Sequence, residues 1–250
     1  STIAGVFVSD GVLSITLPTF SEDVAIKFRA RPSTGQSQRI VAVDTSGATV
    51  TFVLDQGSQP LARVQNNTGL TGTIQDISSI ARFTGRVVDM DPFVFGGEVY
   101  LAVTDEQSHL WLFKGNPTAG TWTVEDLTAS INAPGLTGDL SHYIPSWGTI
   151  HLSGLDARGH QVNYYFQPGV TTTWLFADLT DTIDGPTMTG GLTGYVAPWD
   201  GLNLAGLNDE NEVIVYWWSL QSNGWQTINM TETFSGPQLY GQLDAYVTPW

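Results

Sequence analysis

Aromatic side chains recur in this sequence at a spacing that could build a ligand-binding surface. Trp147, Trp199 and Trp250 are separated by 52 and 51 residues, and each stands within two residues of a proline. An aromatic ring can stack on the apolar face of a sugar, while neighbouring polar groups hydrogen-bond to the sugar hydroxyls. The candidate ligand-binding residues are therefore Trp147, Trp199 and Trp250, together with Tyr165, Trp217 and Trp218.

A second tryptophan series repeats with the same period, at Trp122, Trp174 and Trp225. These residues occupy one register near the end of each repeat, and we expect them to pack between neighbouring repeats. Trp217 and Trp218 are adjacent, so in a strand they point to opposite faces. We therefore expect one of these two side chains to be packed and the other to be partly free.

Catalysis would require a different set of residues. Hydrolysis of a glycosidic bond needs carboxylates that converge on one centre. The candidates are Asp91, Asp139, Asp200 and Asp244, but they do not recur at one register, and solvated acidic loops explain them as well. The sequence contains neither a GxSxG elbow nor a Gly-rich phosphate loop. We therefore predict a protein without enzymatic activity.

The histidines and acidic segments give little support to a metal site. The sequence has four histidines without a spacing such as HExxH, and it has no cysteine. His109 and His160 stand at matching turn positions, which favours a structural role. Segments 178–184 and 208–212 could offer several oxygens to Ca²⁺, but neither has the spacing of a calcium loop. We predict no cofactor, with Ca²⁺ at these two segments as the alternative.

Short strands joined by tight turns must position these residues. Apolar residues make up 41% of the 250 residues and charged residues 13%, with 27 glycines and 12 prolines, which favours strands over helices. The turn residues Asp105, Asp156 and Asn208 repeat at intervals of 51 and 52. In the clearest repeat the four apolar segments are 140–147, 149–155, 161–166 and 171–179. Four antiparallel strands in each repeat predict an all-β fold, the β-propeller, with one blade per repeat.

The two ends of the chain predict how the ring of blades closes. Residues 239–250 repeat the first strand of a blade and stop at Trp250, whereas residues 2–17 read as a strand, an Asp10–Gly11 turn and a second strand. A blade shared between the two termini would close the propeller and remove its exposed sheet edges. We therefore expect a single closed domain that spans residues 1–250.

The turn residues predict five blades: Asp10, Asp44, Asp105, Asp156 and Asn208. The first two intervals are irregular, at 34 and 61 residues, and residues 66–82 read as an inserted loop with one helical turn. A sixth, degenerate blade in this region is the alternative. The predicted blades are 239–250 with 1–20, 21–68, 69–134, 135–187 and 188–238.

The best-defined repeats share a frame of Ser-Trp-Gly, an apolar strand, Asp-x-x-Gly, an aromatic strand, a Trp strand and a closing Leu. One copy comprises Trp147, Gly148, Asp156, Gly159, Tyr164, Tyr165, Trp174 and Leu179, and the next comprises Trp199, Gly201, Asn208, Tyr216, Trp217, Trp218, Trp225 and Met230. Over about 165 residues this frame resembles the repeat of bacterial propeller lectins, including the seven-bladed fucose-binding ones. The resemblance implies a propeller that binds carbohydrate. The Arg and Glu that hold fucose in the related six-bladed lectins have no repeated counterpart here, so it does not name the sugar.

The charge distribution bears on the possible partners. The net charge of −15 argues against nucleic acid and anionic membranes, and no apolar run is long enough to span a bilayer. Seven of the nine basic residues lie within residues 27–86. Lys27, Arg29 and Arg31 alternate along one strand face, and this basic stripe could mediate self-association. Charges that protect an edge strand from pairing explain the stripe as well.

Together these patterns predict a non-enzymatic binding module with carbohydrate as its ligand. The acidic, Lys-poor and Trp-rich composition is common in secreted bacterial modules and predicts an extracellular or cell-surface location. A protein-interaction or surface-structural propeller is the second hypothesis and a glycosidase-like enzyme the third, because propellers host all three.

Overall fold

The protein is built from antiparallel sheets with short helices after four of them. The computed structural model describes residues 4–9, 12–16, 25–30, 38–45, 48–66, 72–245 and 247. Sheet I contains β1 (Ala4–Ser9) and β2 (Val12–Thr16), and sheet II contains β3 (Ala25–Ala30), β4 (Gln38–Asp44), β5 (Ala48–Leu54), β6 (Pro60–Asn66) and β7 (Gly72–Gln75).

Three further sheets have four strands each. Sheet III contains β8 (Val87–Phe95), β9 (Glu98–Asp105), β10 (Leu110–Asn116) and β11 (Thr121–Asp126). Sheet IV contains β12 (Ser141–Tyr143), β13 (Ile150–Leu155), β14 (Gln161–Phe166) and β15 (Leu175–Asp178). Sheet V contains β16 (Gly190–Val196), β17 (Leu202–Leu207), β18 (Val213–Trp218) and β19 (Gln226–Asn229). The helices are α1 (Ile77–Ala81), α2 (Leu127–Ile131), α3 (Leu179–Ile183) and α4 (Met230–Phe234).

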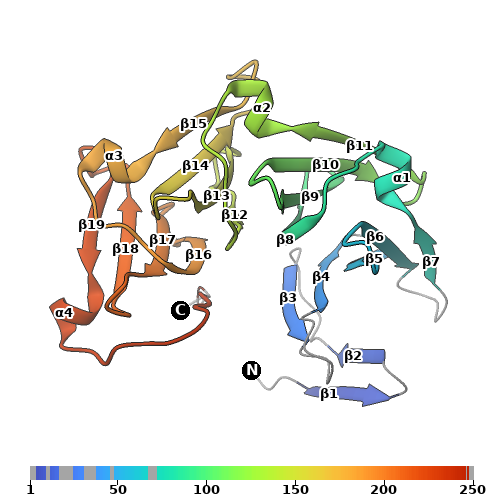
Figure 1. The fold of residues 1–250 in the computed structure, drawn as a ribbon, viewed down its shortest axis with the longest axis horizontal. Helices are drawn as coiled ribbons and strands as arrows, with labels where there is room; N and C mark the ends of the chain where they lie inside the picture. Colours follow the sequence, from blue (N-terminus) through green and yellow to red (C-terminus); the bar gives the residue numbers. More distant parts are fainter. Residues whose placement is uncertain are drawn as a thin grey trace.

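The sheets are arranged as an arc around a common centre (Figure 1). In sheets III to V the first strand lies innermost and the last lies at the rim, and neighbouring strands follow chain order. Each of the four helices follows an outermost strand and lies on the outer side of the arc. This radial arrangement of antiparallel sheets is that of a β-propeller, as the repeat period predicted.

The apolar core lies between successive sheets. Three clusters of buried side chains join sheet II to III, III to IV, and IV to V. Trp122 packs edge-on against Phe52 of sheet II, with ring centroids 5.9 Å apart, and its Nε1 donates to Gln75 Oε1 at 2.7 Å. Trp122 and Trp174 are both buried, which confirms the packing role predicted for this series. Trp225 is only partly buried against the third cluster.

One turn is repeated in sheets II to V. In sheet IV the Asp156 carboxylate accepts hydrogen bonds from the N–H groups of Arg158 at 2.8 Å and His160 at 3.0 Å, and Gly159 has φ of +78°. The Asp55 and Asp105 side chains accept the equivalent pair of hydrogen bonds, and Asn208 Oδ1 accepts from the Glu212 N–H at 2.8 Å. Such side-chain acceptors are the reason that Asp and Asn favour turns.

The hairpin predicted at Asp44 is present between β4 and β5, but it is not the repeated turn of sheet II. The sequence pattern placed it at Asp44, which ends β4, whereas the turn with the repeated hydrogen bonds begins at Asp55. Asp44 starts an Asp-x-x-Gly sequence like that of Asp156, so the short signature alone could not separate the two positions. With Asp55 in place the intervals between the four turns become 50, 51 and 52 residues.

A capped helix follows the last strand of sheets II to V. The N-cap side chains accept from the third N–H of each helix at 2.9, 2.9, 3.0 and 2.9 Å; these caps are Asp76, Asp126, Asp178 and Asn229. The single helical turn predicted within residues 66–82 is therefore confirmed as α1. The same region was wrongly read as an inserted loop, because β7 pairs with β6 and completes sheet II. This short strand lacks the tryptophan that marks its counterparts, so its sequence carried no repeat signal.

The predicted closure of the ring depends on the two ends of the chain, and the structure describes these ends only in part. Sheet I forms the expected N-terminal hairpin, but the described part of the C-terminal segment, 239–245 and 247, contains no strand. Trp250 lies outside the described residues, so the closed ring, the shared blade and the count of five stay predictions.

Of the predicted basic stripe, Lys27 and Arg29 lie in β3, whereas Arg31 lies outside the described residues. Within the described residues no helix is both long and apolar enough to cross a membrane.

Candidate functional site

A pocket of about 330 Å³ lies between sheets IV and V. Four aromatic side chains line it: Trp147, Tyr165, Trp218 and Trp225. Trp147 belongs to the turn between β12 and β13, and its ring meets that of Trp218 edge-on, with centroids 5.7 Å apart and an interplanar angle of 69°. Two rings set at such an angle form a corner against which an apolar ligand surface can pack.

The polar part of the pocket is a connected network. His151 and Asn163 line the pocket and are only 7% and 3% exposed. Tyr143 Oη donates to Asn163 Oδ1 at 3.1 Å, and Ser153 Oγ donates to the same oxygen at 3.0 Å. The amide Nδ2 of Asn163 lies 3.1 Å from His151 Nδ1. His151 is also stacked on Tyr143, with centroids 4.7 Å apart, so its ring orientation is fixed on both the polar and the apolar side.

These contacts determine which nitrogen of His151 carries the proton. Asn163 Oδ1 accepts from the Tyr143 and Ser153 hydroxyls, so we assign its Nδ2 as the donor to His151 Nδ1, which places the proton of the neutral ring on Nε2. Burial lowers the pKa of His151 to about 4, so the ring is neutral at pH 7. Among the described residues Nε2 has no hydrogen-bond partner, although it is fully buried.

The unpaired Nε2–H distinguishes this pocket from an ordinary core. Buried polar atoms without a partner are rare, and each such atom in a native fold calls for an explanation. The other buried side-chain atoms of this kind in the described residues, on Thr104 and Gln161, belong to residues that do not line the pocket. The pocket therefore combines aromatic walls with a buried histidine nitrogen that has no partner among the described protein groups.

The pocket is uncharged at neutral pH. Its remaining lining residues are Thr149, Gln167, Ala177 and Leu202, so no described Asp, Glu, Lys or Arg contributes to the wall. An ionic ligand would lose its hydration on entering this pocket and find no opposite charge there, so its binding would be unfavourable. The chemistry of the lining suits a neutral ligand with both apolar and hydrogen-bonding surfaces.

Three of the six predicted ligand-binding residues meet in this pocket: Trp147, Tyr165 and Trp218. Trp199 lies on the equivalent turn of sheet V, is 70% exposed and does not line the pocket. Trp217 is half-buried and also does not line it, while Trp250 lies outside the described residues. Of the three tryptophans proposed to form one surface, Trp147, Trp199 and Trp250, only Trp147 lines this pocket.

Sequence reasoning missed His151 and Asn163 and misjudged Trp225. Trp225 was expected to be core, but it is partly buried and lines the pocket. His151 and Asn163 lie on strands whose neighbouring repeat has Tyr100 and Leu112 at the same positions. Aligning the repeats position by position would have shown that His151 and Asn163 replace less polar residues. That replacement is the signal that could have identified them from sequence.

The carboxylates considered for catalysis are dispersed. Asp91 is buried and accepts from the backbone N–H of His142 and contacts its Nδ1 at 2.8 Å. Asp139 accepts from the Gly191 N–H at 2.8 Å, and Asp200 accepts from the Ser146 N–H at 2.9 Å, so each carboxylate links one sheet to the next. Asp244 is exposed in the C-terminal segment. None of these described carboxylates lines the aromatic pocket.

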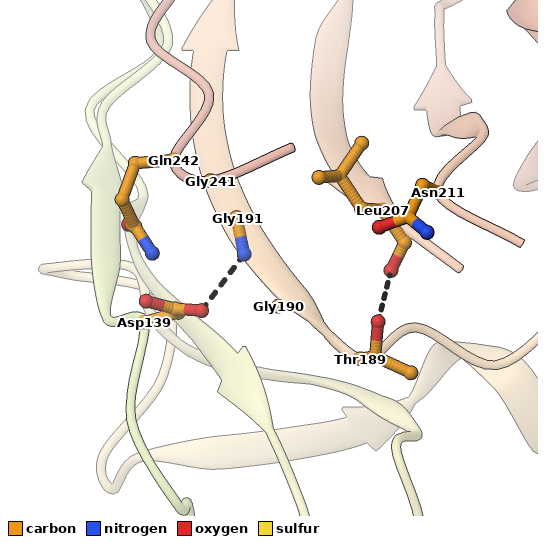
Figure 2. A pocket seen from close by; sticks show the side chains of 8 residues that line it. All are labelled: Asp139, Thr189, Gly190, Gly191, Leu207, Asn211, Gly241 and Gln242. Atoms are coloured by element: carbon orange, nitrogen blue, oxygen red, sulfur yellow. Dashed lines mark hydrogen bonds between the residues drawn. The ribbon is translucent and has the colours of Figure 1, made fainter. Parts of the chain in front are cut away.

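A larger cavity of about 760 Å³ lies beside the C-terminal segment (Figure 2). Its wall is mainly glycine backbone, from Gly190, Gly191 and Gly241, with the Asp139 side chain at one side. The Asp139 carboxylate is held by the Gly191 N–H, and the Thr189 hydroxyl donates to the Leu207 carbonyl at 3.2 Å. This cavity contains no aromatic residue among the described lining, so it offers no ring on which a sugar face could stack.

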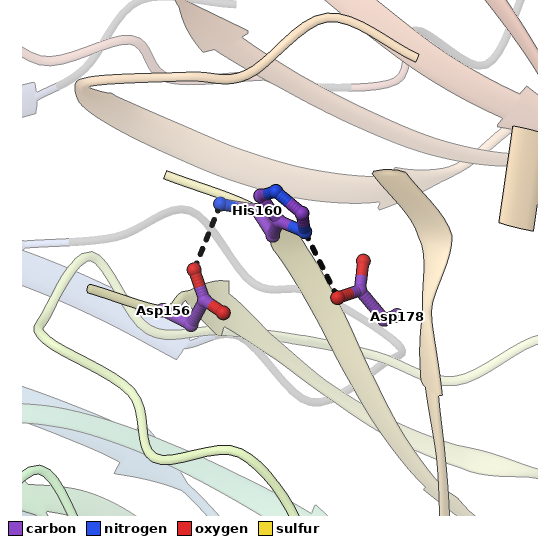
Figure 3. A group of neighbouring side chains, drawn as sticks. All are labelled: Asp156, His160 and Asp178. Atoms are coloured by element: carbon purple, nitrogen blue, oxygen red, sulfur yellow. Dashed lines mark hydrogen bonds and ion pairs between the residues drawn. The ribbon is translucent and has the colours of Figure 1, made fainter. Parts of the chain in front are cut away.

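One group of described side chains has the spacing of metal ligands: Asp156, His160 and Asp178 (Figure 3). His160 Nδ1 lies 2.9 Å from Asp178 Oδ2, and the Arg158 guanidinium lies 2.8 Å from both aspartates. Burial raises the pKa of Asp178, but hydrogen bonds from the Asp181 N–H and from His160 outweigh it and leave that pKa lowered. The arginine is already paired with both carboxylates, as expected of a structural cluster.

The acidic segments proposed for Ca²⁺ have defined structural roles. Segment 178–184 contains the cap of α3 and the helix itself, and segment 208–212 is the repeated turn. His109 Nδ1 contacts Asp126 Oδ2 at 2.6 Å, just as His160 contacts Asp178. The structural role predicted for His109 and His160 is therefore confirmed.

Among solved structures, this chain is similar to AofleA from Arthrobotrys oligospora, with 10% identity and a TM-score of 0.51 over 84% of this chain and 74% of that one. A variant of AofleA with three arginines replaced by alanine gives 11% identity and a TM-score of 0.52 over 84% and 60%. Trypanosoma rangeli sialidase gives 15% identity and a TM-score of 0.48 over 84% and 43%. No family model and no curated protein matches the sequence. The AofleA likeness supports the propeller fold alone, and the resemblance to bacterial lectins stays a prediction.

Proposed function

We propose that this protein is a non-enzymatic carbohydrate-binding module and that the pocket between sheets IV and V is its site. The observation that carries the proposal is the meeting of the Trp147–Trp218 corner with the polar side chains of Thr149 and Gln167 in one uncharged pocket. A sugar presents apolar C–H faces and directional hydroxyls, and both kinds of surface find a counterpart here.

The size of the pocket limits what it can hold. At about 330 Å³ it lies at the lower end of the range of roughly 300–1,000 Å³ for ligand pockets. A single sugar ring fits this description better than a long oligosaccharide. We therefore propose recognition of one residue of a glycan, such as its terminal sugar.

The same lining argues for binding rather than turnover. Glycoside hydrolysis requires paired carboxylates on either side of the bond, and the described pocket wall has none. The aspartates of the neighbouring sheets are engaged in links between sheets. This supports a binding module over a glycosidase-like enzyme, which remains the less favoured hypothesis.

Two finer features of the proposal concern the whole molecule. We propose that the arc closes as a five-bladed ring in which the N-terminal hairpin and the segment after α4 share a blade, because both lie at the open side of the arc (Figure 1). Deletion of residues 239–250 should then lower solubility and the melting temperature, and an unchanged monomer would contradict closure. An extracellular or cell-surface location follows as an expectation from a glycan ligand.

The test compares two tryptophans of the same register. Trp147→Ala should weaken binding to an immobilised glycan panel about tenfold or more, since it removes one wall of the pocket. Trp199→Ala is the matched control, because Trp199 occupies the equivalent turn but does not line this pocket. Melting temperatures of both variants identify any loss of folding.

Each outcome of this comparison is informative. Selective loss in Trp147→Ala supports the site between sheets IV and V. Equal loss in both variants without unfolding would favour the repeated aromatic surface in place of this pocket. Failure of the wild-type protein to bind any glycan, while it binds another protein, would favour the interaction-module hypothesis.

A further inference from the structure

The pocket between sheets IV and V lacks a side chain that another interface contains. In sheet II, Gln75 ends β7 and directly precedes the N-cap of α1. Its counterpart in sheet IV is Ala177, which directly precedes the N-cap of α3 and lines the pocket. Among sheets II to V only sheet IV has no side chain beyond Cβ at this position, which is occupied in turn by Gln75, Glu125, Ala177 and Ile228.

Gln75 shows what this position does when it is filled. Its Oε1 accepts from Trp122 Nε1 of sheet III at 2.7 Å, and its Nε2 donates to the Pro117 carbonyl at 2.6 Å. The carboxamide therefore fills space between two sheets and pairs the indole N–H that faces it. It acts as acceptor and donor at once.

Both hydrogen-bond partners of this carboxamide have counterparts in sheet V. Trp225 lies four residues before the N-cap of α4, as Trp122 does before the N-cap of α2. Leu220 lies five residues before Trp225, as Pro117 does before Trp122. Trp225 lines the pocket with Ala177, and its Nε1 has no hydrogen-bond partner among the described residues. The pocket therefore keeps the indole donor but lacks the carboxamide.

We propose that a hydroxyl of the bound sugar takes the place of this missing carboxamide and accepts from Trp225 Nε1–H. A hydroxyl both accepts and donates, as the Gln75 carboxamide does, so its own proton can go to the Leu220 carbonyl. Ala177 then determines specificity, because a longer side chain would fill the space that the hydroxyl needs. This inference rests on the proposed carbohydrate-binding function and names the residues that receive one hydroxyl of the sugar.

The decisive variant gives the pocket the residue of sheet II. Ala177→Gln should weaken binding to the immobilised glycan panel about tenfold or more, because the added carboxamide competes with the sugar for the Trp225 donor. Its melting temperature should not fall, since the new side chain gains hydrogen bonds like those of Gln75. Loss of binding without loss of stability separates a blocked site from a damaged fold.

Gln75→Ala is the matched control, because it makes the reverse change in an interface away from the pocket. It should lower the melting temperature by about 2–4 °C, as is typical for the loss of one or two hydrogen bonds in a chain of this size. Glycan binding should stay unchanged. A loss of binding in this variant as large as in Ala177→Gln would overturn the local role of Ala177.

A second measurement tests the indole donor itself. The wild type is titrated with glucose, galactose, mannose and fucose, and then with the monodeoxy forms of the tightest binder. One deoxy form should bind about fivefold more weakly than its parent, whereas Trp225→Phe, which keeps a ring without the N–H, should distinguish the two by less than about twofold. The indole ¹H and ¹⁵N signals of Trp225 should also shift when the sugar is added to the wild type.

The outcomes distinguish this inference from the function on which it rests. If Ala177→Gln binds like the wild type while Trp147→Ala does not bind, the hydroxyl assignment is wrong and carbohydrate binding stands. A deoxy sugar that loses affinity equally in the wild type and in Trp225→Phe would also overturn the assignment. If Ala177→Gln does not fold, the deoxy sugars and the Trp225 signals decide. Binding of none of these sugars and of no panel glycan by the wild type would remove the proposed function and this inference with it.

Discussion

The interfaces between sheets III and IV and between sheets IV and V are built on the same frame and yet differ in chemistry. Phe93 of sheet III stacks on Tyr100 with centroids 4.9 Å apart, and Tyr143 of sheet IV stacks on His151 at 4.7 Å. Each pair lies directly across two adjacent strands. The backbone positions are thus equivalent, and the side chains alone distinguish the two interfaces.

The next pair of positions shows the change most clearly. Sheet III places Ala102 opposite Leu112, and both are buried in an apolar cluster. Sheet IV places Ser153 opposite Asn163, which are equally buried but polar. A buried polar group is tolerated when it is hydrogen-bonded, and every polar atom of this network except Nε2 of His151 has a partner.

This difference indicates that the polar network serves the pocket. An apolar pair satisfies the fold in sheet III at less risk, because it leaves no group that needs a partner. In sheet IV the network fixes a donor among aromatic walls. Under the proposed function, the propeller places its binding site in one interface by changing a few side chains on an unchanged frame.

The largest expected effect on stability comes from replacing Asn163 of sheet IV by leucine, the residue at the equivalent position of sheet III. Asn163→Leu should lower the free energy of unfolding by about 3–5 kcal/mol, because Tyr143, Ser153 and His151 lose their shared partner while they stay buried. Urea unfolding measures the loss. Glycan binding should fall at the same time, since His151 is no longer oriented by the amide.

A matched variant tests whether unpaired hydroxyls cause that loss. Adding Tyr143→Phe and Ser153→Ala to Asn163→Leu removes both hydroxyls and makes these positions resemble Phe93, Ala102 and Leu112. The triple variant should regain about 2 kcal/mol relative to the single variant. A triple variant no more stable than Asn163→Leu would show that volume, rather than hydrogen bonding, distinguishes the two interfaces.

The propeller could be predicted from sequence because its signals are periodic. Turn aspartates and rim tryptophans recur at intervals near 51 residues, and each marks a backbone position that every sheet needs. The same reasoning failed where the marker was absent or duplicated. Asp44 mimicked the turn signature of Asp156 without its register, and β7 lacked the rim tryptophan.

The site was predicted only in part for the opposite reason. Trp147, Trp218 and Tyr165 could be selected as large aromatics in a repeat. His151 and Asn163 differ from their counterparts in sheet III, so periodicity hides them rather than marking them. Their importance follows from three-dimensional contacts, above all the shared Asn163 oxygen and the unpaired Nε2.

A second, smaller effect is expected from pH. The pKa of His151 is lowered by burial to about 4, against an ordinary value near 6.5 in the unfolded chain. Between about pH 6.5 and pH 4 the imidazole is therefore protonated in the unfolded state but not in the folded state. The free energy of unfolding accordingly falls as the pH drops through this range. Between pH 7 and pH 5 this site should account for a loss of about 2 kcal/mol.

The comparison of His151→Phe with the wild type isolates that contribution. Urea unfolding of both proteins at pH 7 and pH 5 should show a smaller loss in the variant, by about 2 kcal/mol. Other histidines and the carboxylates titrate equally in both proteins, so their effects cancel in the difference. Identical pH dependence would mean that folding does not lower the pKa of His151.

The smallest expected effect belongs to a feature that all the interfaces share. Asp126 caps α2 by accepting from the Ala129 N–H at 2.9 Å, as Asn229 does for α4. Asp126→Ala should cost about 1 kcal/mol, whereas Asp126→Asn should cost less than about 0.5 kcal/mol because an amide oxygen caps as well. The ion pair with His109 adds little, since that side chain is 39% exposed. Thermal unfolding measures both variants, and neither should change glycan binding, because α2 follows sheet III and contributes no residue to the pocket. If Asp126→Ala weakened binding while it left stability unchanged, the division between a common frame and a single specialised interface would have to be abandoned.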